Sequence, residues 1–303
     1  MRKIKIKGKE LPGIVRSILS FTLIFVIVFL IAELLIVNIE GIAKSMPGYM
    51  ANLDQSFGEV SAFINDPAYV EHLQKWIDNL DLAGMATEIM NSLTGFVANT
   101  AVVVVYVIFF IIEYATYKVK LNKLFPGKGK HYQVVKKSLS QINESISSFI
   151  WQKTLISIIT GAVSYVILVI MGVDYAFLWS FLIFILNFIP YIGPLFSSLF
   201  PAVFAVLITG DLMQLVYVFA AMQAVQIILG NFVEPKMMGK GTNLGPVTVI
   251  VALAFWGMIW GMVGMILAVP VTAVFVIILS QIPSTRYLAI LLSEKGNIPE
   301  IES

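Results

Sequence analysis

The sequence predicts an all-α, polytopic integral membrane protein with broken or re-entrant helical hairpins and amphipathic helices on both membrane faces. Of the 303 residues, 58% are hydrophobic and only 13% are charged, whereas about 25% of a soluble domain is charged. The apolar residues form runs of about 20 residues or more, the length that an α-helix needs to cross a bilayer. Pro and Gly interrupt the two longest runs, where they are expected to break a helix. An ordinary water-soluble globule is therefore excluded.

The first apolar run covers residues 13–37 and follows a basic N-terminus. No small-residue cleavage pattern follows it, so we expect a membrane anchor and not a removable signal. Uninterrupted runs at residues 96–117, 150–173 and 212–230 predict three further spans. Two longer runs each predict a helical hairpin broken by Pro and Gly. They are residues 175–209, with Pro190, Gly193, Pro194 and Pro201, and residues 244–282, with Gly257, Gly261, Gly264 and Pro270.

Lys and Arg set the orientation, because they stay on the cytoplasmic side of membrane helices. The segment after the first span holds only Lys44 and Lys75 against eight acidic residues, so it belongs outside. The Lys-rich segment after the second span belongs inside, and both termini are then cytoplasmic. The predicted organisation is residues 1–40 (basic N-terminus and first membrane helix), 41–95 (extracytoplasmic amphipathic helical segment), 96–117 (second membrane helix), 118–149 (cytoplasmic amphipathic helical segment), 150–282 (core with two Pro/Gly-broken hairpins) and 283–303 (cytoplasmic tail).

Apolar residues recur every three or four positions within residues 41–95 and 118–149, which predicts amphipathic helices. Pro47 and Pro67 are expected to punctuate the outer ones. Such helices pack on the membrane bundle or on another subunit, or else lie on the membrane surface, where a Lys-rich start suits anionic lipid. We therefore expect membrane lipid and further copies of the chain, in a homo-oligomer, as partners.

Several kinds of chemistry are missing from the sequence. There is no Cys, which excludes disulfides and thiol nucleophiles, and the two histidines, His72 and His131, lie in the aqueous segments. Residues 239–242 lack the Gly spacing and the Lys-Thr pair of a P-loop. The basic residues stand in blocks beside apolar runs, which is not typical of a nucleic-acid-binding face. We expect no enzyme, cofactor, metal site or nucleic-acid partner, which leaves a transporter, a channel or a membrane scaffold.

Polar residues within the apolar runs are the candidate functional residues, because polar groups are unfavourable in a bilayer. Asn187 precedes a Pro/Gly break that frees backbone carbonyls, a device with which transporters build substrate sites. Gln223 and Gln226 share one face of the next span. The alternative is a set of interhelical hydrogen bonds that only hold helices together. The candidate substrate or ion pathway is Asn187, Pro190, Gly193, Pro194, Gln223, Gln226, Asn231 and Glu234.

Three neighbouring features receive simpler interpretations. The segment Glu234-Pro235-Lys236 is expected to end a helix at its proline, so that its opposite charges meet, either as a gate or ion ligand or as an interface anchor. Lys153 opens its span and is expected to snorkel toward the cytoplasmic surface. The pair Ser197-Ser198 is typical of small hydroxyls at helix contacts.

Four motifs resemble those of the autoinducer-2 exporter family of membrane permeases and occur in the same order. They are residues 153–161 (KTLISIITG), 187–193 (NFIPYIG), 234–239 (EPKMMG) and 255–270 (FWG to VP). The resemblance is strong over about residues 151–279 and continues back to about residue 11. It implies an oligomeric secondary permease, with some members associated with autoinducer-2 export and others with sodium/proton antiport. Members usually begin with a further pair of membrane helices, which we expect this chain to lack.

We expect a secondary transporter, a permease or exporter, of a small polar solute such as a quorum-sensing signal, with its pathway between the two broken hairpins. The polar side chains of the candidate pathway would bind the solute through hydrogen bonds. A sodium/proton antiporter with Glu234 as its titrating carboxylate is the first alternative. A membrane scaffold that moves nothing is the second, and its sign would be a side-chain-filled interface around Gln223.

Overall fold

The protein is almost entirely α-helical in the computed structural model, which confirms the predicted all-α class. The structure describes residues 5–6, 9–10, 13–63, 129–238, 243–296 and 298, with isolated helical residues between 106 and 124. The exception to the helices is an antiparallel ladder of β1 (Lys5–Ile6) and β2 (Lys9–Glu10). The chain divides into two compact units, residues 1–51 with 57–120 and residues 52–56 with 121–303.

A long helix, α1 (Gly13–Phe63), accounts for most of the described part of the first unit. Its stretch Val26–Tyr49 is long and apolar enough to cross a bilayer. Pro47, which was expected to punctuate the chain, lies inside α1, although an interior proline removes one backbone hydrogen bond and crowds the carbonyl four residues earlier. Buried residues recur at helical spacing on one face of α1: Ala32, Leu35, Ile39, Ile42 and Tyr49.

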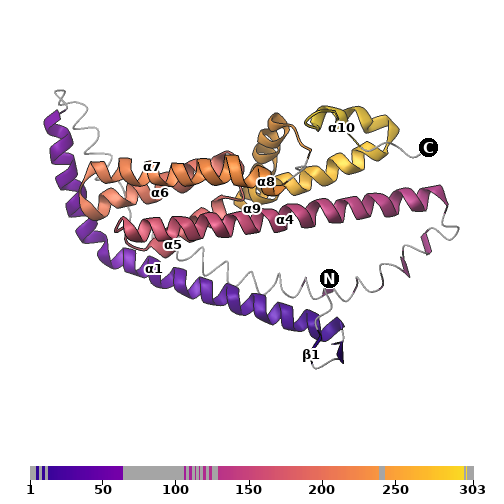
Figure 1. Cartoon of the computed structure of the whole chain (residues 1–303), viewed down its shortest axis with the longest axis horizontal. Helices are drawn as coiled ribbons and strands as arrows, with labels where there is room; N and C mark the ends of the chain where they lie inside the picture. The colour runs from indigo at the N-terminus through magenta and orange to yellow at the C-terminus, as the bar shows by residue number, and fades with distance from the viewer. Residues whose placement is uncertain are drawn as a thin grey trace. The chain divides into compact units, whose positions relative to one another are not determined.

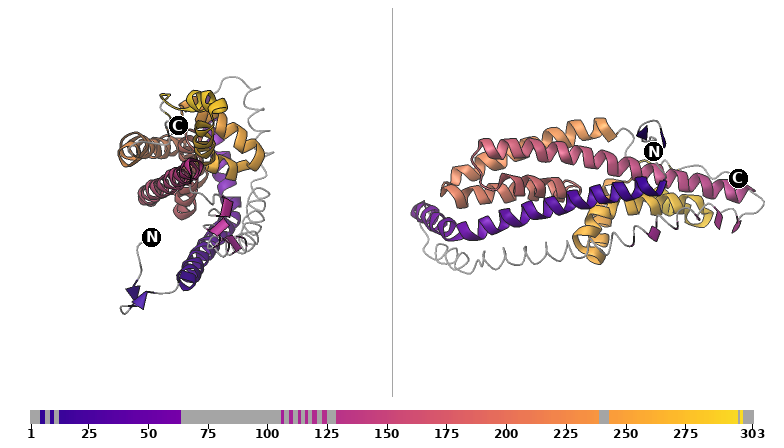
Figure 2. Two further views of the ribbon diagram at one scale, coloured as in Figure 1. Left: turned by 90° about the vertical axis from the view of Figure 1, so that its right-hand side faces the viewer. Right: turned by 90° about the horizontal axis from the view of Figure 1, so that it is seen from below.

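The second unit is a bundle of helices followed by a bent helix. In Figures 1 and 2 the helices α4, α5, α6 and α7 lie side by side, and α10 lies beside α9. The elements in chain order are α4 (Lys130–Ile170), α5 (Ala176–Leu186), α6 (Ile192–Thr209), α7 (Leu212–Ile228), the π-helix η1 (Leu229–Val233), α8 (Glu234–Met238), α9 (Pro246–Gln281), the 3-10 helix η2 (Pro283–Thr285) and α10 (Arg286–Leu292).

Within the described residues, five helices are long and apolar enough to cross a membrane, which makes this a multi-pass membrane protein. The helix α5, with 11 residues, is shorter than a full span. The span expected at residues 96–117 lies mostly outside the described residues. The five candidate spans are Val26–Tyr49, Tyr132–Ile170, Ile192–Thr209, Leu212–Met237 and Pro246–Gln281.

The helix α4 joins two segments that composition alone separates. It runs without interruption for 41 residues, a length of about 60 Å. It therefore contains residues 130–149 of the expected cytoplasmic segment, residues 118–149, and residues 150–170 of the expected third span, residues 150–173. No Pro or Gly stands between residues 130 and 160, so nothing in the sequence stops the backbone ladder there. The change of composition near residue 150 therefore does not interrupt the helix.

Both predicted hairpins are broken, but at fewer points than Pro and Gly mark. The first breaks between α5 and α6, at residues 187–191, and the second at Gly261 within α9. Gly261 has φ 61° and ψ −141°, a backbone conformation that glycine tolerates and side chains oppose. The two arms of α9 run in different directions from this point (Figure 1).

Pro201 and Pro270, which were also expected to interrupt the hairpins, lie buried inside α6 and α9. A bundle tolerates such prolines because neighbouring helices compensate for the freed backbone group. Gly257 and Gly264 stay within the arms of α9 as well. Gly264 allows close packing across the bend, since a Cβ atom there would lie 1.9 Å from the carbonyl oxygen of Trp256.

One apolar core connects the bend of α9 with the break between α5 and α6. It takes residues from α4, from the end of α5 and the break, from both arms of α9 and from α10. Because these elements are far apart in sequence, their packing is what brings the two broken regions together. The buried members are Phe149, Leu186, Ile189, Leu244, Val249, Ala252, Leu253, Ala268, Val269, Ala273, Val276 and Ala289.

Candidate functional site: a polar cavity at the broken helices

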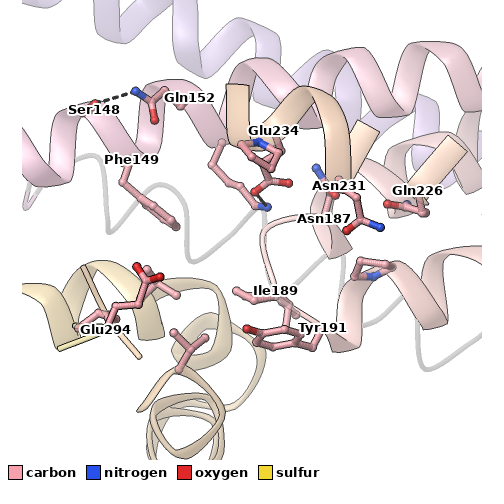
Figure 3. Close-up of a pocket in the computed structure, with 18 of the residues that line it drawn as sticks. Ser148, Phe149, Gln152, Asn187, Ile189, Tyr191, Gln226, Asn231, Glu234 and Glu294 are labelled. Carbon is pink, nitrogen blue, oxygen red and sulfur yellow. Dashed lines mark hydrogen bonds and ion pairs between the residues drawn. The ribbon is translucent and has the colours of Figure 1, made fainter. Parts of the chain in front are cut away.

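A cavity of about 730 Å³ lies within the second unit. Its walls come from α4, the break between α5 and α6, the end of α7 with η1 and α8, and the arms of α9. In the close-up of Figure 3, Asn187, Gln226, Asn231 and Glu234 lie close together, while Glu294 lies apart from them. The volume is within the range of about 300–1,000 Å³ that is typical of sites for small molecules.

The break between α5 and α6 is a tight and strained turn. The amide of Asn187 still donates to the Ile183 carbonyl at 2.9 Å, but Pro190 has no amide hydrogen with which to continue the ladder. Tyr191 then adopts φ 62° and ψ −52°, and Ile192 donates to the Pro190 carbonyl at 2.7 Å. This is a γ-turn with positive φ at its centre, a rare conformation that side chains oppose. Strain of this kind is commonly found at functional sites.

Gly193 allows α6 to start directly against the end of α5. Its amide donates to the Ile189 carbonyl at 3.0 Å, and a Cβ atom there would lie 1.9 Å from the Leu186 carbonyl oxygen. No side chain fits at that distance, so this position requires glycine. Gly193 thus shapes the turn, although its own atoms do not line the cavity.

The break leaves backbone carbonyls available. Among the described residues, no backbone amide donates to the carbonyl of Asn187 or of Phe188. Buried carbonyls normally have a partner, from protein or from water. Asn187 borders the cavity, so a solute or water there is within reach of this part of the chain. Such free backbone is tolerated at membrane depth only where it is buried in protein or lines a cavity.

Serine hydroxyls on α4 and α6 hold the amide side chains at the cavity. Asn187 donates through Nδ2 to Ser157 Oγ at 3.0 Å, and Gln226 donates through Nε2 to Ser197 Oγ at 2.8 Å. These four side chains are buried. These two hydrogen bonds use the amide nitrogens. Asn187 Oδ1 and Gln226 Oε1 accept no hydrogen bond from a described side chain, which leaves them as acceptors for a solute.

Ser197 and Ser198 have a second function in the same region. Both hydroxyls donate to the Pro194 carbonyl at 3.0 Å, and Ser198 also lies 3.4 Å from Gln223 Oε1. They were expected to be helix contacts, and they are, because they connect α6 with α7. They also fix Gln223 and Gln226, which border the cavity. The hydroxyls therefore support the amides that a solute would meet.

The helix that carries Asn231 and Glu234 is irregular. After α7 the chain forms the π-helical turn η1, in which the Glu234 amide donates to the Leu229 carbonyl, five residues earlier. Pro235 follows, but the helix continues as α8 to Met238, so Pro235 does not end it as expected. In a regular α-helix the ring of Pro235 would collide with the carbonyl of residue 231, and the wider π turn changes that register. Such π-bulges are frequent at functional sites.

Glu234 forms an ion pair across the bundle. Lys153 Nζ on α4 lies 2.5 Å from Glu234 Oε1, and the two side chains are only 7% and 18% exposed. Two expectations from the sequence are therefore wrong. Lys153 does not snorkel to the surface but is buried. Glu234 pairs with Lys153, although Lys236 was the expected partner, and Lys236 is exposed. The packing of α4 against α8, which local sequence does not encode, decides the partner.

The structure brings together most of the residues singled out from the sequence. Seven of the eight, all except Gly193, border the same cavity. Sequence reasoning missed a polar face of α4, because that segment was interpreted as lying outside the membrane or at its surface. Ser145, Ser148 and Gln152 recur at three and four residues, and this spacing could have revealed the polar face. The lining residues with polar side chains that lie outside the candidate pathway are Ser145, Ser148, Gln152, Lys153, Tyr191, Asn243 and Glu294; of these, Lys153 was singled out from the sequence, but for another role.

A multi-pass helical membrane protein with a polar cavity between interrupted helices has the general plan of a membrane transporter. The family comparison gives the same class. The model of a family described as "AI-2E family transporter" matches residues 3–284, so this chain belongs to that family. This confirms the resemblance that the four motifs indicate.

Similar proteins carry transport names. A protein of Haemophilus influenzae named "Putative transport protein" is 29% identical over 285 residues, which cover 91% of this chain and 82% of the relative. The "AI-2 transport protein TqsA" of Escherichia coli (strain K12) is 26% identical over 288 residues, 94% of this chain and 82% of the relative. The "Putative transport protein YhhT" of the same organism is 30% identical over 234 residues, 77% of this chain and 66% of the relative.

Proposed function

We propose that this membrane transporter is a secondary permease for a small polar solute and that the cavity in the second unit is its pathway. The observation that carries the proposal is the convergence of Asn187, Gln223, Gln226 and Glu234, from three separate elements, on one cavity. A membrane scaffold would instead have a filled interface around Gln223. The cavity beside Gln223 favours passage.

The chemistry of the cavity suits an uncharged or weakly charged polar solute. Amide oxygens of Asn187 and Gln226 accept hydrogen bonds, and their orientation is fixed in advance by Ser157 and Ser197. Fixed groups lose little conformational entropy when a ligand binds. The relative named for AI-2 transport makes autoinducer-2 the first solute to test on this chain.

The proposal includes an orientation and an assembly. We propose that both termini are cytoplasmic, with Asp174 and Asp211 on the outer side and Lys236 on the inner side, because Lys and Arg are retained on the cytoplasmic side. Asp174, Asp211 and Lys236 are all exposed, so cysteines placed at these positions can be labelled from the aqueous phase. The homo-oligomer expected from the amphipathic segments is tested by native mass spectrometry in lipid, where a single chain would contradict it.

Flux through proteoliposomes tests the pathway. Asn187→Ala, Gln223→Ala and Gln226→Ala are each compared with wild type for uptake or efflux of autoinducer-2. Gln214→Ala is the matched control, because Gln214 is on α7 and does not line the cavity. We expect at least one cavity variant to lose most of the flux while the control keeps it. Unchanged flux in all three would remove the cavity as the pathway.

A sodium/proton antiporter is the second candidate, and one observation favours it: Glu234 is a carboxylate on a candidate span that borders the cavity. Glu234→Gln would then abolish pH changes that depend on sodium in vesicles. A wild-type response of zero eliminates this candidate. We place it second because Lys153 already neutralises the carboxylate.

A further inference from the structure

The ion pair between Lys153 and Glu234 lies at the wall of the cavity. An ion pair that only holds helices together has no need to lie there. Both residues line the cavity, and both are largely buried. Glu294 is the remaining charged residue among those that line it, and it is exposed. The largely buried charges among the described lining residues are therefore one ammonium group and one carboxylate group in contact.

An unpaired carboxylate in such a place would attract a cation. Burying a single charge is strongly unfavourable, so a carboxylate away from bulk water binds a proton or a counter-ion. Here the counter-ion is part of the chain, because Lys153 Nζ lies 2.5 Å from Glu234 Oε1. The ammonium group occupies the place that a free monovalent cation would take.

We propose that Lys153 is a tethered counter-ion that fills the cation position at Glu234 and thereby sets the selectivity of the cavity against inorganic cations. This inference rests on the proposed function, because it concerns which solutes the same cavity accepts. It assigns Lys153 a role as a specificity-determining residue. It also states why a carboxylate at the cavity is compatible with passage of an uncharged solute.

Removing the ammonium group should create a cation site. Lys153→Met keeps a side chain of similar length without charge and leaves the Glu234 carboxylate uncompensated. We expect sodium uptake into proteoliposomes to rise about tenfold or more over wild type, the ratio that corresponds to about 1.4 kcal/mol. Sodium should also raise the unfolding temperature of the purified variant in a saturable way, because a ligand of the folded state stabilises it by mass action.

Matched variants separate this role from simple loss of a salt bridge. Lys236→Met removes an exposed lysine two residues from Glu234 and should behave as wild type. Lys153→Arg keeps the charge and should also exclude sodium. The double variant Lys153→Met with Glu234→Gln has neither charge, so it should lose the gain in sodium binding. A structural link alone predicts instability in the single variants, with no response to sodium.

The absence of Cys from the chain allows a direct rescue. Lys153→Cys is treated with an aminoethyl methanethiosulfonate, which restores a positive charge, or with a propyl methanethiosulfonate, which restores only length. We expect the aminoethyl group, and not the propyl group, to abolish the sodium response. Lys153→Cys also provides a second neutral variant, with a smaller side chain, if Lys153→Met fails to fold.

Two results would overturn the inference. One is a folded Lys153 variant that binds and admits no more sodium than wild type. The other is a sodium gain that persists in the double variant, since the Glu234 carboxylate is then not involved. Sodium-dependent unfolding in detergent needs no transport, so it is independent of the proposed function. Unchanged autoinducer-2 flux in the alanine variants would remove the cavity as the pathway and leave the binding result standing, whereas the absence of flux in wild type would reject the proposed function.

Discussion

Asn187 donates a hydrogen bond of 3.0 Å to Ser157 on α4, 30 residues earlier in the chain. The bond joins the end of α5, where the helical ladder is interrupted, to a helix that passes beside it. Both side chains are buried, with 5% and 0% of their surface exposed. A residue at a strained break thus depends on a distant helix for its orientation.

Ser157→Ala should remove the hydrogen bond from Asn187 and lower both the stability of the protein and its solute flux. The Asn187 amide would remain buried without its partner, which costs about 1–3 kcal/mol. We expect a lower unfolding temperature and reduced solute flux. The matched control is Ser138→Ala, also on α4, because among the described residues the Ser138 hydroxyl donates to the Val134 carbonyl of its own helix. Equal losses of flux in the two variants would contradict a special role for the bond, and thermal unfolding with flux assays measures both.

Gly193→Ala should strongly destabilise the second unit. The added Cβ would lie 1.9 Å from the Leu186 carbonyl oxygen, so the turn must move. Overpacking of a tight contact typically costs about 1–3 kcal/mol, and more where backbone is involved. Gly48→Ala on α1 is the control, since no atom of the part of the chain that the structure describes lies within 4 Å of its Cβ position. That exchange within a helix should be neutral or stabilising by up to about 1 kcal/mol. Thermal unfolding in detergent compares the two variants.

Tyr191 allows the backbone strain of the γ-turn to be measured. Its side chain is 57% exposed, so truncation loses little packing. Tyr191→Gly and Tyr191→Ala both remove the ring, but only glycine relieves the positive φ of 62°. We expect the Gly variant to be the more stable of the two by about 1 kcal/mol or more. An Ala variant as stable as the Gly variant would mean that the turn is not strained.

The orientation can be tested with single cysteines in the Cys-free chain. Asp211→Cys should react with a membrane-impermeant maleimide added to intact cells, whereas Lys236→Cys should react only after the membrane is opened. The reason is the Lys and Arg bias that places the loop after α7 inside. Both positions are exposed in the structure, so accessibility depends on the side of the membrane. The reverse pattern would invert the proposed topology.

Much of the fold follows from the sequence. Runs of apolar residues long enough to cross a bilayer specify helices, because every backbone group must be paired within lipid. Asn187 and the prolines after it mark the break between α5 and α6 for a local reason, since Pro190 cannot donate and Tyr191 to Gly193 must turn sharply. The polar residues of the candidate pathway were visible for a similar reason, as exceptions within apolar surroundings.

Other features depend on contacts between distant parts of the chain. Pro201 and Pro270 have the same local chemistry as Pro190, yet they stay inside helices, because their surroundings in the bundle tolerate one missing hydrogen bond. Pro235 likewise follows a π turn and not a helix end. Local sequence marks where a helix is weak, and packing decides whether it breaks.

The sequence by itself determined the all-α membrane class, the position of the first break and the identity of the polar residues, because each follows from backbone hydrogen bonding and solubility in lipid over short stretches. Only the tertiary structure decided that Glu234 pairs with Lys153, 81 residues away, and that Ser157 and Ser197 orient the amides. The physical reason is that a charge or an amide can pair with any partner that the packed helices bring within about 3 Å, and that partner can be far away in the sequence.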